Sequence, residues 1–235
     1  MSTETNLYAS EYLHWPQSFS NLQEKERVAD LAAAKAQPGE VIGIGSGSSS
    51  YLVLRALGRR VREEGLAITV VTSSYETDTA AATLAIPSLA LGSVRPAWGV
   101  DGADEVDPDR RLLKGRGGAL YKEKILWHGC ERMYLAVDSS KYVERLGEKF
   151  SIPIELDRCA VKLVADFIDS HGSLGEVRYE LRNAGGKDGP VITEAGNLIL
   201  DLWCGQIPQG FSGELKALPG VIETGLFEGY DYEIL

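Results

Sequence analysis

Apolar and polar positions follow an alternating strand and helix pattern over the first 140 residues. Short apolar runs at 40–45 ("EVIGIG"), 66–74 ("LAITVVTSS") and 97–105 ("AWGVDGADE") predict buried strands. The segments between and before them space their apolar residues at helical intervals and predict helices at 22–36, 50–65 and 75–85. Ser20 and Gln23 form a candidate capping box for the first helix. Strands that alternate with helices predict a parallel sheet with crossover helices.

From about Phe150 the pattern changes. Strands are predicted at 150–157, 176–183, 197–205 and 221–227, with helices at 159–172 and 211–220. This β-α-β-β-α-β order is typical of a ferredoxin-like unit, and the glycine-rich segment "AGGKDGP" is expected to be a surface turn. The last residues are strand-like and could return to the first sheet. We therefore predict a parallel-sheet domain over 1–147, completed by 228–235, and a smaller α+β domain over 148–227.

Composition limits the class of protein. The chain has 235 residues, 44% of them hydrophobic, which is enough to bury a core. Neither an apolar run of membrane-spanning length nor a signal peptide is apparent, so we expect a cytoplasmic protein without a membrane partner. The net charge of −10 argues against a nucleic-acid surface.

Cysteine and histidine patterns do not predict a metal site. Cys130, Cys159 and Cys204 form no CxxC pair and are expected to be reduced packing residues. The histidines are far apart in the sequence and lack the spacing of metal ligands.

Candidate chemistry lies at the ends of the predicted strands. Because ligands bind beyond the carboxyl ends of parallel strands, the segments "SGSSS", "TSSYET", "DGADE" and "LAVDSSK" could share one cleft. "GIGSGSSS" matches neither a P-loop nor a dinucleotide fingerprint. Its hydroxyls at a helix N-terminus could bind a phosphate, or the segment could be only a tight turn capped by Ser48.

Charges are segregated between Val100 and Leu126. Asp101 and Asp104 could face one pocket and bind sugar hydroxyls or move protons, or they could be solvated acids of an Asx-type turn. Lys114 precedes a glycine run, and Glu123 is the only acid within the basic block that follows. That block could attract an anion or be a solvated face. A lysine and a carboxylate near a carbon acid are the groups that enolisation needs.

Six motifs in order carry a family resemblance. "GSGSS", "DGADE", "KGRGGAL" followed by Glu123, "DSSK", "EAGNLILDL" and "PGVIETGLF" resemble ribose-5-phosphate isomerase of the type A family, from about residue 22 onward. The resemblance implies a Rossmann-like α/β domain carrying a ferredoxin-like domain, in agreement with the pattern above. It implies interconversion of ribose 5-phosphate and ribulose 5-phosphate through an enediolate.

The resemblance also implies site residues. It assigns Glu123 as the base, Asp101 and Asp104 as active-site aspartates, and Lys114 as the pocket lysine. Substrate contacts are expected from Ser46, Gly47, Ser48, Ser49, Gly102, Ala103, Gly115, Arg116, Gly117 and Lys141. We expect no metal or organic cofactor, a small sugar phosphate as the only ligand class, and a homodimer or homotetramer.

Three other functions are alternatives to this one. A sugar-phosphate sensing module of related fold would need a helix-turn-helix extension, and residues 1–20 are too short and insufficiently basic to supply one. A deaminase or lactonase of related fold does not predict Lys114 together with Glu123. An isomerase for a different pentose phosphate is the closest alternative and stays open.

Overall fold

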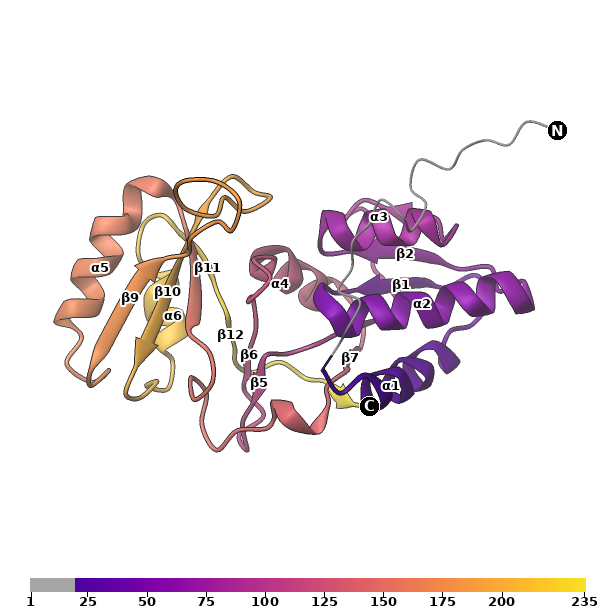
Figure 1. Ribbon diagram of the computed structural model, residues 1–235, viewed down its shortest axis with the longest axis horizontal. Helices are drawn as coiled ribbons and strands as arrows, with labels where there is room; N and C mark the ends of the chain where they lie inside the picture. Colours follow the sequence, from indigo (N-terminus) through magenta and orange to yellow (C-terminus); the bar gives the residue numbers. More distant parts are fainter. Residues whose placement is uncertain (1–19) are drawn as a thin grey trace. The chain divides into compact units, whose positions relative to one another are not determined.

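The computed structural model describes residues 20–235 (Figure 1). These residues divide into two compact units, each described here by itself. The first unit comprises residues 20–102, 122–138 and 231–235, and the second comprises 103–121 and 139–230. The sequence pattern predicted a boundary near residue 147. In the structure, the second unit also includes 103–121, 139–147 and 228–230, which the pattern placed in the first domain.

The first unit is built on a six-stranded sheet in the order β13-β7-β4-β1-β2-β3, and every neighbouring pair is parallel. Its strands are β1 (Val41–Ile44), β2 (Thr69–Thr72), β3 (Ser88–Leu89), β4 (Trp98–Asp101), β7 (Met133–Leu135) and β13 (Glu233–Ile234). The predicted parallel sheet is confirmed. The predicted return of the last residues to this sheet is also confirmed, because β13 pairs with β7.

Helices α1 (Leu22–Ala34), α2 (Gly47–Glu64), α3 (Tyr75–Thr83) and α4 (Leu120–Gly129) belong to this part of the chain, α4 beginning in the second unit. The three predicted helices thus form, with slightly different ends. The chain runs outward from β1 through β2 to β3 and then crosses back to β4 on the other side of β1. The adjacent carboxyl ends of β1 and β4 are therefore a topological switch point, where open α/β sheets bind ligands.

The predicted capping box at the start of α1 is wrong. The N-cap is Asn21, in the left-handed region with φ of 52°, and no side chain caps the helix. Asn21 donates its side-chain amide to Asp138 Oδ1 at 2.7 Å, and Lys25 donates to Ser20 Oγ at 3.2 Å. The bond from Asn21 to Asp138 joins residues far apart in the sequence, so a local pattern could not reveal it.

The second unit contains an antiparallel sheet in the order β11-β8-β10-β9. Its elements are β8 (Ile152–Leu156), α5 (Val161–Ser170), β9 (Val177–Leu181), β10 (Leu198–Cys204), α6 (Phe211–Lys216) and β11 (Val221–Thr224). This confirms the predicted ferredoxin-like order. Both helices contribute to the same apolar core, and the rings of Phe167 on α5 and Phe211 on α6 stack with centroids 6.4 Å apart.

A three-stranded sheet in the second unit joins β5 (Glu105–Val106), β6 (Leu112–Leu113) and β12 (Leu226–Phe227). Fully buried Glu105 accepts backbone N–H bonds from Gly147, Lys149 and Phe150 at 2.6, 2.6 and 2.9 Å. Two short 3₁₀ turns, Ser139–Lys141 and Arg158–Ala160, complete the unit. These long-range bonds explain why 103–121 and 139–147 join the second unit.

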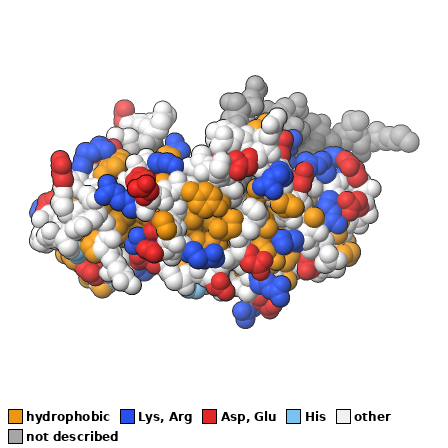
Figure 2. Space-filling model, turned by 90° about the horizontal axis from the view of Figure 1, so that it is seen from below, with side chains coloured by type: hydrophobic (Ala, Val, Ile, Leu, Met, Phe, Trp, Pro, Cys, Tyr) orange, Lys and Arg blue, Asp and Glu red, His pale blue; other side chains and the backbone are white. Residues whose placement is uncertain are grey.

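Acidic and basic side chains are interspersed over the face seen in Figure 2, with hydrophobic side chains between them. The net charge of −10 is thus not gathered into one acidic patch on that face. No helix within residues 20–235 is both long and apolar enough to cross a membrane.

Gly43 in β1 gives a test of this packing. A Cβ there would lie 2.6 Å from Cys130 Sγ, 3.1 Å from a Leu126 methyl group and 3.2 Å from Gly99 Cα. We predict that Gly43→Ala lowers the free energy of unfolding by about 1–3 kcal/mol through overpacking. Cys130→Ala removes the closest atom, so the double variant should lose less stability than the sum of the single variants.

Urea unfolding midpoints of the original protein, the two single variants and the double variant measure this coupling. Gly213→Ala in α6 is the control, because a Cβ there meets no atom within 4 Å and alanine favours a helix. A Gly43→Ala protein as stable as the original would contradict the packing.

Candidate active site

The ends of β1 and β4 approach each other very closely. Gly45 follows β1 and donates its N–H to Val100 O at 2.8 Å. A Cβ on Gly45 would lie 2.0 Å from Asp101 Oδ1. Any larger residue at position 45 would displace the Asp101 carboxylate, so the second glycine of "GIGSGSSS" is required by its neighbour on β4.

Ser46 and Glu123 meet although they are far apart in sequence. Ser46 is the N-cap of α2, but its hydroxyl does not cap that helix. It donates instead to Glu123 Oε1 at 2.5 Å. Glu123 lies on α4 and is 3% exposed. The alternative in which Ser48 caps the turn is wrong, because α2 already begins at Gly47.

Asp101 is completely buried. Its Oδ1 accepts the N–H of Gly102 at 2.8 Å and lies 3.4 Å from Ser50 Oγ, which donates to it. Its Oδ2 accepts the indole N–H of Trp127 at 2.9 Å. The alternative of a solvated acid is therefore wrong for Asp101, although the Gly102 bond does have the local form of an Asx turn. Donors therefore reach both oxygens of the carboxylate and fix its position.

The second unit holds the glycine-rich segment 115–118, here called the glycine loop, and its charged neighbours. Asp104 N–H donates to Leu113 O at 2.8 Å, and Asp104 Oδ2 accepts the N–H of Arg116 at 3.1 Å. The Lys114 side chain is buried, with Nζ 5.5 Å from the centroid of the Phe227 ring. Asp104 thus fixes the backbone of the loop that carries Lys114.

Arg116 and Lys141 share an aromatic neighbour. The guanidinium of Arg116 lies 4.6 Å from the centroid of the Phe150 ring, and Lys141 Nζ lies 6.0 Å from the same centroid. Both cations are thus held in the second unit near one ring, at distances typical of cation–π contacts.

Arg182 holds the backbone of the glycine loop. Its guanidinium donates to the carbonyl oxygens of Gly115 and Arg116 at 3.0 and 2.9 Å, and to both carboxylate oxygens of Asp201 at 2.8 and 2.6 Å. Gly115 has φ of 94°, and a Cβ there would lie 2.8 Å from Leu120 Cβ. The loop is therefore positioned by the ferredoxin-like sheet.

Each unit gathers a different part of the predicted set. In the first unit, Ser46 contacts Glu123, and a Cβ on Gly102 would lie 3.4 Å from Ser49 Cβ. The first unit thus carries Ser46, Gly47, Ser48, Ser49, Asp101, Gly102 and Glu123, and the second carries Ala103, Asp104, Lys114, Gly115, Arg116, Gly117 and Lys141.

Sequence reasoning missed three residues that contact the set: Ser50, Trp127 and Arg182. Ser50 and Trp127 donate to Asp101, and Arg182 holds the glycine loop. Trp127 had a usable signal, because it follows Glu123 by one helical turn on α4. Arg182 had none, because its partners come from distant segments.

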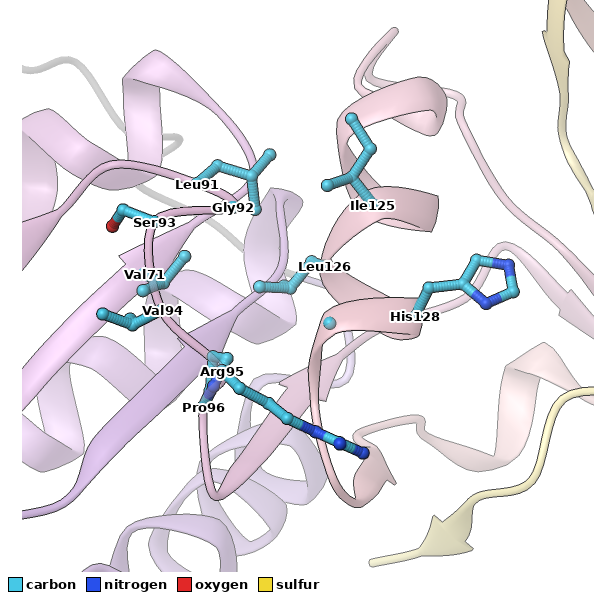
Figure 3. Close-up of a pocket in the computed structure, with 11 residues that line it drawn as sticks. Val71, Leu91, Gly92, Ser93, Val94, Arg95, Pro96, Ile125, Leu126 and His128 are labelled. Atoms are coloured by element: carbon cyan, nitrogen blue, oxygen red, sulfur yellow. The ribbon is translucent and has the colours of Figure 1, made fainter.

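A cavity of about 540 Å³ opens elsewhere on the first unit (Figure 3). Its lining includes Val94, Arg95, Ile125 and His128, and none of the predicted site residues.

Cys130 lies near Asp101 in the core of this unit. Burial, followed by the charge of Asp101, raises the pKa of the Cys130 thiol to about 12. Cys130 is therefore a neutral thiol at ordinary pH.

Within residues 20–235, no group of three or more His, Cys, Asp or Glu residues could hold a metal ion.

Comparisons with known proteins agree on one family. The family model described as ribose 5-phosphate isomerase A (phosphoriboisomerase A) matches residues 69–235. Ribose-5-phosphate isomerase A of Methanothermobacter thermautotrophicus is 40% identical over 213 residues, covering 90% of this chain and 91% of the relative. The protein named ribose-5-phosphate isomerase A from Thermosynechococcus vestitus is 39% identical over 209 residues, or 87% of each chain.

Solved structures agree with the sequence relatives. Ribose 5-phosphate isomerase A from Methanocaldococcus jannaschii superposes with a TM-score of 0.84 at 36% identity, covering 90% of this chain and 93% of that one. A D-ribose-5-phosphate isomerase in complex with phospho-erythronic acid superposes with a TM-score of 0.84 at 34% identity, covering 91% and 93%.

Proposed function

The chain belongs to the ribose 5-phosphate isomerase A family, and we propose that it interconverts D-ribose 5-phosphate and D-ribulose 5-phosphate through an enediolate. It is therefore an aldose–ketose isomerase. The observation that carries the mechanism is the hydrogen bond from half-buried Ser46 to buried Glu123, next to Gly45, which packs against the buried carboxylate of Asp101. The relative solved with phospho-erythronic acid supports a sugar phosphate as the ligand.

Ring opening is assigned to the aspartates. A carboxylate takes the proton of the anomeric hydroxyl, the bond between C1 and the ring oxygen breaks, and the ring oxygen receives a proton. The product is the open-chain aldehyde. Asp101 and Asp104 assist this exchange and hold the sugar hydroxyls. Asp101 suits the task because donors on both oxygens hold its carboxylate in a fixed position.

Proton transfer between carbons is assigned to Glu123. Its carboxylate takes the proton from C2, the electron pair forms the C1–C2 double bond, and the carbonyl electrons move onto O1. The hydroxyl at O2 then loses its proton as O1 gains one, and Glu123 returns its proton to C1. Lys114 is assigned to stabilise the oxyanion, together with the backbone N–H groups of the glycine loop. One well-placed donor in such a role contributes about 3–4 kcal/mol.

Glu123→Gln tests the base. The amide keeps the size of the side chain and can still bond to Ser46, but it cannot accept the C2 proton. We predict a fall in kcat of about 10²- to 10⁴-fold with substrate binding retained. Turnover of ribose 5-phosphate and deuterium incorporation from solvent measure the loss, and circular dichroism checks the fold.

Glu131→Gln is the matched control, because Glu131 is exposed just beyond α4. It should turn over as the original does. If a folded, ligand-binding Glu123→Gln protein works within a few-fold of the original, the base must be one of the aspartates.

The N-terminus of α2 is proposed to bind the phosphate. The first N–H groups of a helix lack intrahelical partners and favour an anion. Gly47 has φ of 79°, and a Cβ there meets no atom within 4 Å. Gly47→Val would therefore act by straining the backbone, and we predict that it raises KM for ribose 5-phosphate by roughly tenfold or more, the effect of one lost charge-assisted hydrogen bond.

Gly65→Val places the same strain at the other end of α2, because Gly65 has φ of 68° and a Cβ there would meet no atom within 4 Å. It should leave KM unchanged. Unphosphorylated ribose should be a poor substrate, and equal kcat/KM for ribose and its phosphate would remove this site. Other pentose 5-phosphates assayed alongside decide which sugar is preferred.

We further propose a cytoplasmic homodimer or homotetramer. Self-association is supported by apolar side chains exposed on the first unit: Leu89 is 41%, Val94 is 39% and Ile125 is 36% exposed. Val94 and Ile125 line the cavity of Figure 3, and Leu89 lines an adjoining cavity that shares Leu91.

Sedimentation velocity at micromolar concentration should give a dimer or tetramer, and Ile125→Lys should shift it toward monomer. Leu163→Lys is the control, because Leu163 is 43% exposed, somewhat more than Ile125, but lies on α5 of the second unit. A monomeric original protein would contradict the proposal.

A further inference from the structure

Trp127 and Glu123 lie one turn apart on α4, so their side chains lie on the same face of the helix. Both are buried, at 4% and 3% exposure. Glu123 bonds to Ser46 after β1, and Trp127 bonds to Asp101 at the end of β4. One face of α4 therefore contacts both strand ends of the switch point.

The indole N–H of Trp127 fixes one half of the Asp101 carboxylate. Asp101 Oδ1 is held by the backbone N–H of Gly102, but Oδ2 accepts the Trp127 bond at 2.9 Å. Because the two donors act on different oxygens, together they restrict rotation of the carboxylate about its bond to Cβ. A donor on one oxygen alone would restrict this rotation less.

The indole is itself held in place. The ring of Tyr232, next to β13, meets the Trp127 ring edge to face, with centroids 5.9 Å apart and planes at 77°. Aromatic pairs prefer this geometry. The C-terminal segment thus orients the indole whose N–H reaches Asp101.

We infer that Trp127 is a positioning residue, which fixes the carboxylate of Asp101 relative to Glu123. The inference rests on the proposed isomerase function, in which both carboxylates act on one sugar. A misplacement of a reacting group by about 1 Å can cost on the order of 10²-fold in rate. The indole N–H therefore contributes to turnover without contacting the sugar.

Trp98 offers a matched control within the same sheet. Its indole N–H donates to Glu40 Oε2 at 3.0 Å, its ring meets Tyr134 edge to face at 5.6 Å and 76°, and it is 5% exposed. It begins β4, whereas Asp101 ends that strand. The two indole N–H groups thus make the same kind of bond to a carboxylate, Trp98 from the start of β4 and Trp127 from α4 to the end of β4.

The test replaces each indole by benzothiophene, which keeps the ring shape and substitutes sulfur for the N–H group. With Trp127 replaced, kcat for ribose 5-phosphate should fall by about 10- to 100-fold, with KM within a few-fold of the original. With Trp98 replaced, kcat should stay within twofold of the original. This should hold even if the Trp98 replacement lowers the unfolding midpoint as much as the Trp127 replacement does. Equal kcat values for the original and the Trp127 replacement would overturn the inference, as would equal losses at both tryptophans.

A double-mutant cycle with Asp101→Asn tests whether the effect passes through that carboxylate. In the Asp101→Asn background, the Trp127 replacement should cost little further rate. Full additivity would make the role of Trp127 merely structural and overturn the inference.

The indole ¹⁵N–¹H resonances give a readout that does not depend on activity. Asp101→Asn should move the Trp127 signal to lower proton shift, because the acceptor loses its charge, and should leave the Trp98 signal in place. An unmoved Trp127 signal would overturn the bond on which the inference depends. Absence of isomerase turnover in the original protein would instead count against the proposed function.

Discussion

The first unit depends on burying one carboxylate at the end of β4. Asp101 has no exposed surface, and a buried carboxylate is costly unless it is paired with donors. The donors come from its own turn, from α2 and from α4. Gly45 leaves room for it, since any Cβ there would overlap Oδ1. The turn after β1, the start of α2 and the buried face of α4 are therefore fixed together around Asp101.

The second unit uses the same device in its loops. Glu105 accepts three backbone N–H groups of the segment 147–150, and Asp201 orients Arg182. Arg182 in turn holds two carbonyl groups of the glycine loop. Buried or half-buried carboxylates thus make irregular backbone rigid where no strand or helix would do so. A rigid loop suits electrostatic catalysis, because its donors need no rearrangement as charge develops.

The sequence predicted those features that local patterns encode. The alternation of strands and helices gave the parallel sheet, and the order of elements after Phe150 gave the ferredoxin-like unit. The motif order also predicted Ser46 and Glu123 as site residues, and the structure brings these two into contact. Local patterns failed where a distant partner decides the outcome: Asp138 binds the amide of Asn21, and the bonds of Glu105 to residues 147–150 explain why 139–147 belong to the second unit. Trp127 and Arg182 belong to the same class, because only the fold shows what they contact.

The proposed site residues of the first unit come from separate motifs because of the switch in strand order. The chain returns from β3 to the far side of β1, so β4 pairs with β1 and places Asp101 beside Gly45. Helix α4, which follows β4 in sequence, then contacts both strand ends through Glu123 and Trp127. A motif such as "GSGSS" therefore has little meaning by itself. Ser46 contacts Glu123 only because the topology brings a later helix to it, and this is why the order of motifs indicates function better than any one of them.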